Sequence, residues 1–301
     1  MTLGQRLGYE ADAKLLIVNA DDFGMCHAEN LAIQQLFQEG VISSTTLMTP
    51  CGWAREAALW SAAHPEYHVG VHLTFTSEWS GYKWGPVTRS GDVSSLVTKE
   101  GYFPADCATF ESQADREQVR LEMIHQIEMA RSMGVDPTHL DNHMGSLYGL
   151  VTGNHFLDVV FEVCLQYGLP FRLPRSLPEM DKIPSEAAEI AKRVGELADS
   201  MGVVILDYLI GLPFGKQPGE TYESYKGDMI NVLKSLKPGV SEIIIHPAFA
   251  DDELRSIHHE WEKRQWDFEL FRDPEVREVI QQEGIRLIRW KELREVQRQT
   301  Q

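Results

Sequence analysis

The sequence has few of the features that mark membrane proteins, secreted proteins or nucleic-acid-binding proteins. No apolar run is long enough to cross a bilayer, and the first residues, MTLGQRLGYEADAK, contain no apolar core of a signal peptide. Lys and Arg number 28 against 45 Asp and Glu, which gives a net charge of −17. This balance argues against a broad basic face for polyanions and disfavours adhesion to anionic lipid. A neutral or cationic small molecule is the expected partner.

Cysteine is also scarce. The four cysteines, Cys26, Cys51, Cys107 and Cys164, are far apart and form no CxxC pair. This spacing is typical of reduced, partly buried thiols and not of a disulfide framework. Because a signal peptide is missing as well, we expect a soluble cytoplasmic protein.

The chain carries no Pro/Ser-rich linker, no low-complexity run and no sequence repeat, and 43% of its residues are hydrophobic. We therefore expect residues 1–301 to form a single domain with a substantial core. Strand-like and helix-like segments alternate almost to the end of the chain. The strand-like segments lie near residues 15–20, 41–48, 68–75, 138–143, 170–174, 203–208, 242–249 and 284–290. This alternation predicts an α/β fold, a TIM-barrel-like barrel of seven or eight mostly parallel strands.

One long stretch, at about residues 76–112, interrupts the alternation after the third strand. It is rich in Gly, Ser and aromatic residues, and we predict a long loop insertion there, because such loops in compact domains are usually functional. Trp79, Tyr82 and Trp84 could form a wall for a sugar ring, although simple packing over the barrel mouth is an equal alternative. Trp261 and Trp266 could add a second wall.

The segment KLLIVNADDFG, residues 14–24, is the centre of the prediction. Its apolar run reads as a strand buried on both faces, and it ends in the adjacent acids Asp21 and Asp22. Barrel folds place their chemistry at the carboxyl ends of strands. Repulsion between neighbouring carboxylates would be relieved by a cation, or by a division into one proton acceptor and one metal ligand. The structural alternative is that the two acids only cap the N-terminus of the helix that begins near His27.

Further polar residues follow other predicted strands, and in a barrel the ends of these strands converge on one face. One carboxylate and two imidazoles form a common set for a divalent ion. Each residue alone has a structural alternative, such as a hydrogen-bonded core histidine or a structural ion pair. The residues in question are His72, His143, Arg172, Asp207 and His246.

Five motifs in this order resemble the YdjC-like carbohydrate deacetylases, also called the chitooligosaccharide deacetylase family. The motifs are NADDFG, GVHLTF, HLDNH, FRLP and IIIHPAF, and the similarity extends from about Lys14 to Trp290. The resemblance implies a TIM-barrel-like fold, one divalent metal ion, and hydrolysis of the linear amide C–N bond of N-acetylated sugars or oligosaccharides. It also implies a homodimer as a family-level expectation.

The resemblance also implies roles for individual residues. By the family pattern, Asp21 is the general base, His246 is the general acid, and Arg172 orients a catalytic carboxylate or touches the substrate. The metal ligands are Asp22, His72 and His143. Zinc suits these ligands, and magnesium or manganese stay open. The residues themselves leave open which of the two acids is the base.

Two departures from the family pattern stand out. Gly145 replaces a histidine that often follows the second metal-binding histidine, and Ala248 replaces the glycine of His-Pro-Gly. Two rival functions also stay open. The first is a metal-dependent phosphoesterase, which would need more cationic groups at the barrel mouth than Arg172 and Arg175. The second is a sugar-binding protein with the same barrel fold and no catalytic activity.

Overall fold

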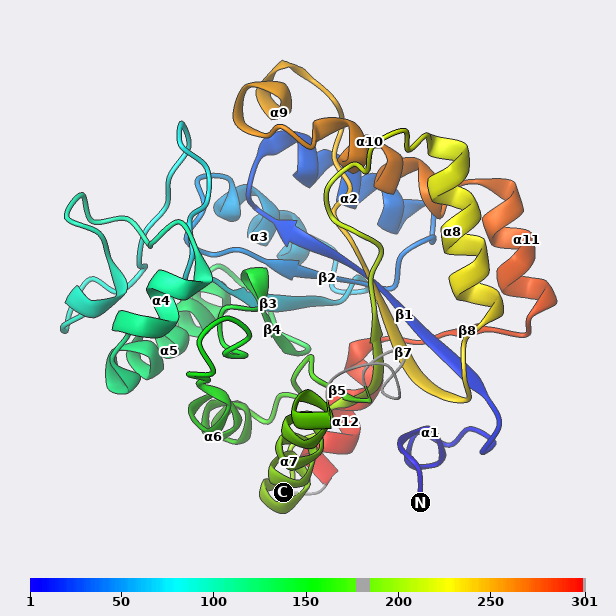
Figure 1. The fold of residues 1–301 in the computed structure, drawn as a ribbon, viewed down its shortest axis with the longest axis horizontal. Helices are drawn as coiled ribbons and strands as arrows, with labels where there is room; N and C mark the ends of the chain where they lie inside the picture. Colours follow the sequence, from blue (N-terminus) through cyan, green and yellow to red (C-terminus); the bar gives the residue numbers. More distant parts are fainter. Residues whose placement is uncertain (177–184, 300–301) are drawn as a thin grey trace.

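The computed structural model describes residues 1–176 and 185–299, and within helix α7 it describes side chains from residue 192 onward. Its centre is a curled, wholly parallel sheet with the strand order β4-β3-β2-β1-β7-β6-β5, and β8 pairs with β1 beside this path (Figure 1). The predicted TIM-barrel-like α/β fold is confirmed. The strands are β1 (Lys14–Phe23), β2 (Ser44–Leu47), β3 (Val69–Leu73), β4 (Leu140–Asn142), β5 (Pro174–Ser176), β6 (Leu206–Ile210), β7 (Gly239–Ile245) and β8 (Arg286–Leu287).

The two ends of this strand order meet at one isolated parallel bridge between Leu140 and Phe171. There Leu140 N–H donates to the Pro170 carbonyl, and Arg172 N–H donates to the Leu140 carbonyl. The strand predicted over 170–174 is displaced to Pro174–Ser176. Pro170 and Pro174 have no N–H to donate, so the hydrogen bonds of the predicted segment come from the residues between them: Phe171 N–H donates to the Val204 carbonyl, and the Leu173 carbonyl accepts from Leu206 N–H.

Strand β1 is the centre of the sheet, and nine of its ten residues are buried. It pairs with β7 from Lys14 to Ala20 along one edge. Along the other edge it pairs with β8 near its start and with β2 near its end. The continuous apolar run is thus explained by burial on both faces.

Helices cover the outer face of the curled sheet (Figure 1). Within the described ranges, no helix has both the length and the hydrophobicity needed to cross a membrane. The helices are α1 (Leu3–Arg6), α2 (His27–Gln38), α3 (Ala54–Ala63), α4 (Cys107–Gln113), α5 (Arg116–Ser132), α6 (Leu157–Tyr167), α7 (Ser185–Met201), α8 (Tyr222–Lys234), α9 (Asp252–Ile257), α10 (Trp261–Leu270), α11 (Pro274–Gln282) and α12 (Trp290–Gln299).

The long connection after β3 is irregular from residue 74 to residue 106, apart from one short 3₁₀ turn at Ser94–Leu96. It ends earlier than the predicted residue 112, because Asp106 caps α4 by accepting from Thr109 N–H. The buried Glu122 of α5 anchors the connection by accepting from the N–H groups of Val87 and Thr88. The loop is therefore fixed to the barrel by a buried carboxylate.

All four cysteines are free thiols. Cys26, Cys51 and Cys164 are buried, and Cys107 is partly buried. Burial raises the pKa of each thiol, and for Cys107, where Glu111 adds to the effect, it raises the pKa to about 11. Thiolate is therefore scarce at neutral pH.

Candidate active site

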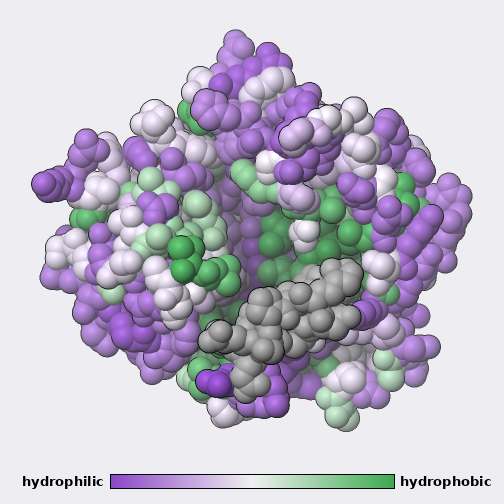
Figure 2. Space-filling model, viewed as in Figure 1, coloured by the Kyte–Doolittle hydropathy of each residue, from purple (hydrophilic) through white to green (hydrophobic). Residues whose placement is uncertain are grey.

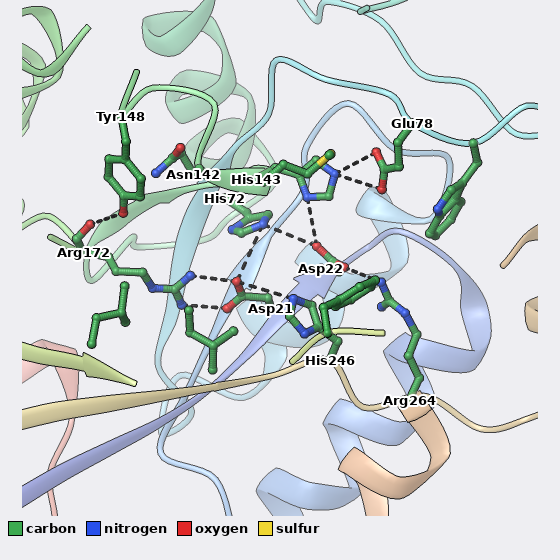
Figure 3. Close-up of a pocket in the computed structure, with 16 residues that line it drawn as sticks. Asp21, Asp22, His72, Glu78, Asn142, His143, Tyr148, Arg172, His246 and Arg264 are labelled. Carbon is green, nitrogen blue, oxygen red and sulfur yellow. Dashed lines mark hydrogen bonds and ion pairs between the residues drawn. The ribbon is translucent and has the colours of Figure 1, made fainter. Parts of the chain in front are cut away.

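A cavity of about 420 Å³ opens at the carboxyl ends of the strands. In Figure 2 hydrophobic side chains gather around the hollow on this face, which agrees with the apolar members of its lining, among them Trp79, Met144, Leu209, Phe214 and Ile244. Figure 3 shows the charged members pointing toward one another. They are Asp21, Asp22, His72, Glu78, His143, Arg172, His246 and Arg264. The structure thus brings together the predicted residues from the first, third, fourth, fifth and seventh strand ends.

Asp21 is held by Arg172 in a bidentate pair, with Nη1 to Oδ2 at 2.7 Å and Nη2 to Oδ1 at 2.6 Å. Arg172 is itself buried and also pairs with Asp141 at 2.8 Å and with Glu242 at 2.6 Å. Burial opposes ionisation of Asp21, but the Arg172 charge outweighs it and holds the pKa of Asp21 well below its ordinary range. Asp21 is therefore an oriented carboxylate that stays ionised.

Asp22 faces two imidazoles through one of its oxygens. Its Oδ1 lies 3.4 Å from His72 Nε2 and 3.3 Å from His143 Nδ1, and one atom from each of the three side chains lies within 4.8 Å of the others. The Oδ1 atom is buried and has no hydrogen-bond partner of acceptable geometry. A buried, orphaned carboxylate oxygen between two ring nitrogens fits a divalent metal with Asp and two His ligands.

A carboxylate behind each ring fixes its orientation. His72 Nδ1 lies 2.7 Å from Asp141 Oδ1, so Nδ1 is assigned the proton and Nε2 is left to face Asp22. His143 Nε2 lies 3.0 Å from Glu78 Oε2, so Nδ1 is the nitrogen that faces Asp22. Such outer carboxylates are the usual partners of metal-binding histidines. Asp141, His72 and Asp21 form a second possible metal group, but Arg172 already occupies both of these carboxylates.

The carboxylates around the two histidines shift the pKa values of both rings. Burial opposes their protonation, but Asp141 raises the pKa of His72 to about 9, and Glu78 raises the pKa of His143 well above its ordinary value. The anionic surroundings therefore favour positive charge between these rings. A metal ion can supply that charge in place of the two protons.

The backbone of NADDFG turns sharply at the site. Asp22 has a φ of 65°, and its carbonyl accepts from Met25 N–H. Gly24 follows with a φ of 95°, and a Cβ there would meet Ala54 Cα at 2.8 Å. Left-handed backbone is uncommon for residues other than glycine, although Asp tolerates it better than most. The glycine of the motif is thus required by conformation and by close packing against α3.

His246 follows β7 and lies beside Asp21, with Nε2 at 4.0 Å from Oδ2. The two groups are therefore neighbours, and no sugar ring separates them. The backbone N–H of His246 donates to the buried Asp267 of α10. Ala248 is not among the described residues with positive φ, so the missing glycine places no strain on the backbone there.

The three predicted aromatic residues have different places. Trp79 lines the cavity, but Tyr82 and Trp84 lie behind it and are absent from the lining. The Tyr82 hydroxyl donates to the Met25 carbonyl, and Trp84 Nε1 donates to the Thr76 carbonyl. Tyr82 and Trp84 therefore support Trp79 and the turn beneath it.

Four other candidates lie outside the cavity. Trp261 packs against Arg255, and Trp266 packs near Tyr225. Arg175 pairs with Asp199, and Asp207 accepts from Val240 N–H near the start of β7, at the opposite end of the sheet. Asp207 precedes the end of β6 by three residues, which explains why its position in the strand misled the prediction.

Sequence reasoning missed Glu78 and Arg264, which line the cavity, and Glu242, which pairs with Arg172. Glu78 comes from the irregular loop, and Arg264 comes from α10, so no strand end marks either of them. Glu242 is a charged residue within the otherwise apolar strand β7, and this unusual position could have indicated a functional role.

Comparison with known proteins relates the chain to sugar deacetylases. The model of the family described as YdjC-like protein matches residues 15–282. A carbohydrate deacetylase of Thermus thermophilus is 30% identical over 295 residues, which cover 98% of this chain and 99% of the relative. A chitooligosaccharide deacetylase of Enterobacter sp. (strain 638) is 24% identical, over 91% of this chain and 97% of the relative.

One solved structure is also similar over nearly the whole chain. It is that of a protein from Enterococcus faecalis V583. Its TM-score is 0.74 at 29% identity, and the match covers 93% of this chain and 99% of that one. The barrel described above is therefore shared with a protein of known structure.

Proposed function

The chain belongs to the YdjC-like protein family, and from this premise we propose that it is a carbohydrate deacetylase that hydrolyses the acetamide C–N bond of N-acetylated sugars or oligosaccharides. The observation that carries the proposal is the buried group of Asp22, His72 and His143 beside the Asp21–Arg172 pair. This arrangement combines a metal-ligand set with an ionised, oriented carboxylate in one cavity. Those are the parts that metal-assisted amide hydrolysis requires.

Asp22, His72 and His143 would hold one divalent metal ion. When bound, such an ion lowers the pKa of water and polarises a carbonyl oxygen. Two ring nitrogens and one carboxylate suit zinc best, because magnesium prefers oxygen ligands. We therefore propose zinc as the first metal to test and magnesium as the second.

Asp21 acts as the general base in this proposal. It takes the proton of the water whose oxygen forms the new bond to the acetyl carbon. The bidentate contact with Arg172 fixes the direction of its lone pairs. The same contact keeps Asp21 in its proton-accepting form, because the pKa of this carboxyl is lowered.

His246 acts as the general acid. Its protonated ring donates to the sugar nitrogen as the C–N bond breaks, so acetate and a free amino sugar are released. The short separation from Asp21, 4.0 Å between Nε2 and Oδ2, lets both groups serve one reacting centre. A proton taken up by Asp21 is also near enough to restore His246 through one water molecule.

The lining of the cavity favours a sugar amide over a phosphate ester. Trp79 offers an aromatic face, and Met144, Phe214 and Leu209 add apolar surface suited to the C–H faces of sugar rings. The arginines of this lining, Arg172 and Arg264, are each paired with a carboxylate. Neither is free to bind a phosphate.

We further propose that residues 1–301 form one domain, since β1 pairs with strands from both halves of the chain. A cytoplasmic location and a homodimer stay predictions at this point. Size-exclusion chromatography with light scattering would test the homodimer directly.

The proposal is tested by metal analysis of the purified protein, followed by an acetate-release assay on N-acetylglucosamine and its oligosaccharides. Release that disappears with a chelator and returns with zinc or magnesium supports the proposal. Metal binding without acetate release from any of these sugars would contradict it and favour the sugar-binding alternative. Phosphate release from a sugar phosphate would favour the phosphoesterase.

Two substitutions separate the roles of the site residues. Asp21→Asn should retain the metal and lose at least about 100-fold in kcat, because only the proton acceptor is removed. His72→Ala should lose both metal and turnover, because it removes a ligand. Equal loss of metal from Asp21→Asn and Asp22→Asn would contradict the assignment of Asp21 as the base and Asp22 as the metal ligand.

A further inference from the structure

Arg264 is a buried charge at the site to which the proposed reaction gives no role. It belongs to α10, its side chain is 2% exposed, and it lines the cavity close to Asp22 (Figure 3). Most of the other site residues lie at or near strand ends, whereas Arg264 is on a helix. Its position requires an explanation, because an arginine beside a metal ligand would ordinarily repel a cation.

The two oxygens of Asp22 have different partners. Oδ1 faces His72 and His143 at 3.4 Å and 3.3 Å. Oδ2 accepts a hydrogen bond from Arg264 Nη2 at 2.9 Å. A carboxylate that could bind a metal through both oxygens is thereby left with one.

Arg264 is itself fixed from three sides. Its Nη1 pairs with Glu29 of α2, which is fully buried. Its guanidinium lies 5.8 Å from the Trp79 ring centre and 5.3 Å from that of Phe214, within the range of cation–π contacts. The charge of Glu29 offsets that of Arg264, so the repulsion of a metal cation is small while the orientation of Asp22 is firm.

We propose that Arg264 is a positioning residue for the metal: it holds Asp22 Oδ2 so that Oδ1 alone is presented to the ion, and Glu29 holds Arg264 in turn. The inference rests on the metal site of the proposed function. It explains how a side chain on left-handed backbone, with a φ of 65°, keeps one direction. It also makes α10 and α2 part of the metal site, although neither supplies a ligand.

The test compares zinc affinities of the chelator-treated, full-length protein by competition with a chromophoric chelator. Arg264→Gln should bind zinc 10- to 100-fold more weakly than wild type, the usual effect of losing an outer partner of a metal ligand. Arg264→Lys should recover part of the loss, because an ammonium can still donate to Oδ2 but cannot reach Glu29 as well. Cobalt absorption gives a second readout, since an Asp22 freed to bind through both oxygens would raise the coordination number and weaken the bands.

Arg294→Gln is the matched control. Arg294 is also a buried arginine, but it belongs to α12 and donates to the Pro137 carbonyl, away from the cavity. The zinc affinity of the Arg294→Gln variant should equal that of wild type. A similar loss in Arg294→Gln would assign the effect to general destabilisation and overturn the inference.

Arg264→Gln leaves Glu29 buried without its partner, which can prevent folding. The double variant Glu29→Gln with Arg264→Gln removes both charges and keeps the comparison valid. Wild-type zinc affinity and cobalt bands in whichever Arg264 variant folds would overturn the inference while leaving the metal site standing. Failure of the wild type to bind metal would instead overturn the proposed function, and the inference with it.

Discussion

Each of the two adjacent acids has its own buried arginine. Arg172 binds Asp21, and Arg264 binds Asp22. Burial opposes ionisation of both acids, but these arginines and the neighbouring imidazoles keep the pKa of each below its ordinary range. The repulsion expected from the sequence is therefore relieved by cationic side chains, and the arginines also point the two carboxylates toward different partners.

A substitution at Arg172 tests how much this orientation contributes. Arg172→Lys keeps the charge but cannot bridge Asp21, Asp141 and Glu242 with one ammonium. We expect kcat to fall roughly 100-fold with little change in KM or metal content, because the proton acceptor is misaligned. Steady-state kinetics at saturating metal provide the measurement.

Arg175→Lys serves as the control for that substitution. Arg175 pairs with the exposed Asp199 and lies outside the cavity, so its kcat should match wild type. An Arg172→Lys enzyme with wild-type kcat would show that bidentate orientation of Asp21 is unimportant.

At the scale of elements, alternation along the chain predicted the strands and helices well, because buried strands and amphipathic helices have distinct periodicities. The boundaries were less accurate where local chemistry decides them. Strand β5 begins at Pro174, where the predicted strand ends, and the Asp106 cap starts α4 inside the predicted loop. The loop from residue 74 to residue 106 has no periodicity that could show which of its side chains face inward.

The aromatic residue of this loop that reaches the cavity is Trp79. Replacing it with alanine should raise KM about five- to tenfold, as expected for the loss of about 1 kcal/mol of aromatic contact, with a smaller effect on kcat. Kinetics on an N-acetylated oligosaccharide with saturating metal would measure this. Trp261→Ala is the matched control and should leave KM unchanged, because Trp261 packs against Arg255 outside the lining.

At the scale of the whole molecule, buried titratable groups lie at both ends of the sheet. The carboxyl ends hold the acids and imidazoles of the site. His68 directly precedes β3 at the amino end of the sheet, and the basic residues Arg289, Lys291 and Arg294 lie near it. Burial first, and these cations second, lower the pKa of His68 to about 4 from an unfolded value of 6.5.

This shift predicts a pH dependence of stability. Between pH 6.5 and 4 the unfolded chain binds a proton at His68 that the folded protein does not bind. The free energy of unfolding should therefore fall as the pH decreases through this window. We expect about 1–2 kcal/mol from His68, less than the full shift would give, because solvent screens the neighbouring charges.

Urea unfolding at pH 7 and at pH 4.5 would measure this change in the free energy of unfolding. The loss of stability should be smaller in His68→Gln than in wild type by that amount. His64→Gln is the control, since the His64 ring is partly buried and contacts the Trp60 carbonyl. An unchanged pH dependence in His68→Gln would contradict the prediction.

Strand ends and motifs in the sequence predicted the residues assigned to catalysis and metal binding. The motif-based resemblance to the YdjC-like family is confirmed by the family match, and the six residues assigned to catalysis and metal binding line one cavity. The groups that orient them could not be predicted in the same way. Glu78 and Arg264 come from a loop and an outer helix, and only tertiary packing brings them beside His143 and Asp22.

The low reactivity expected of the four native thiols has a practical consequence for spectroscopy. Because burial keeps Cys26, Cys51, Cys107 and Cys164 protonated at neutral pH, maleimide reagents should react slowly with the native protein. A cysteine introduced at Ser80, an exposed position in the loop that carries Trp79, would then be the fast-reacting thiol. A fluorophore attached there would test whether this part of the loop moves during turnover, without removal of any native cysteine.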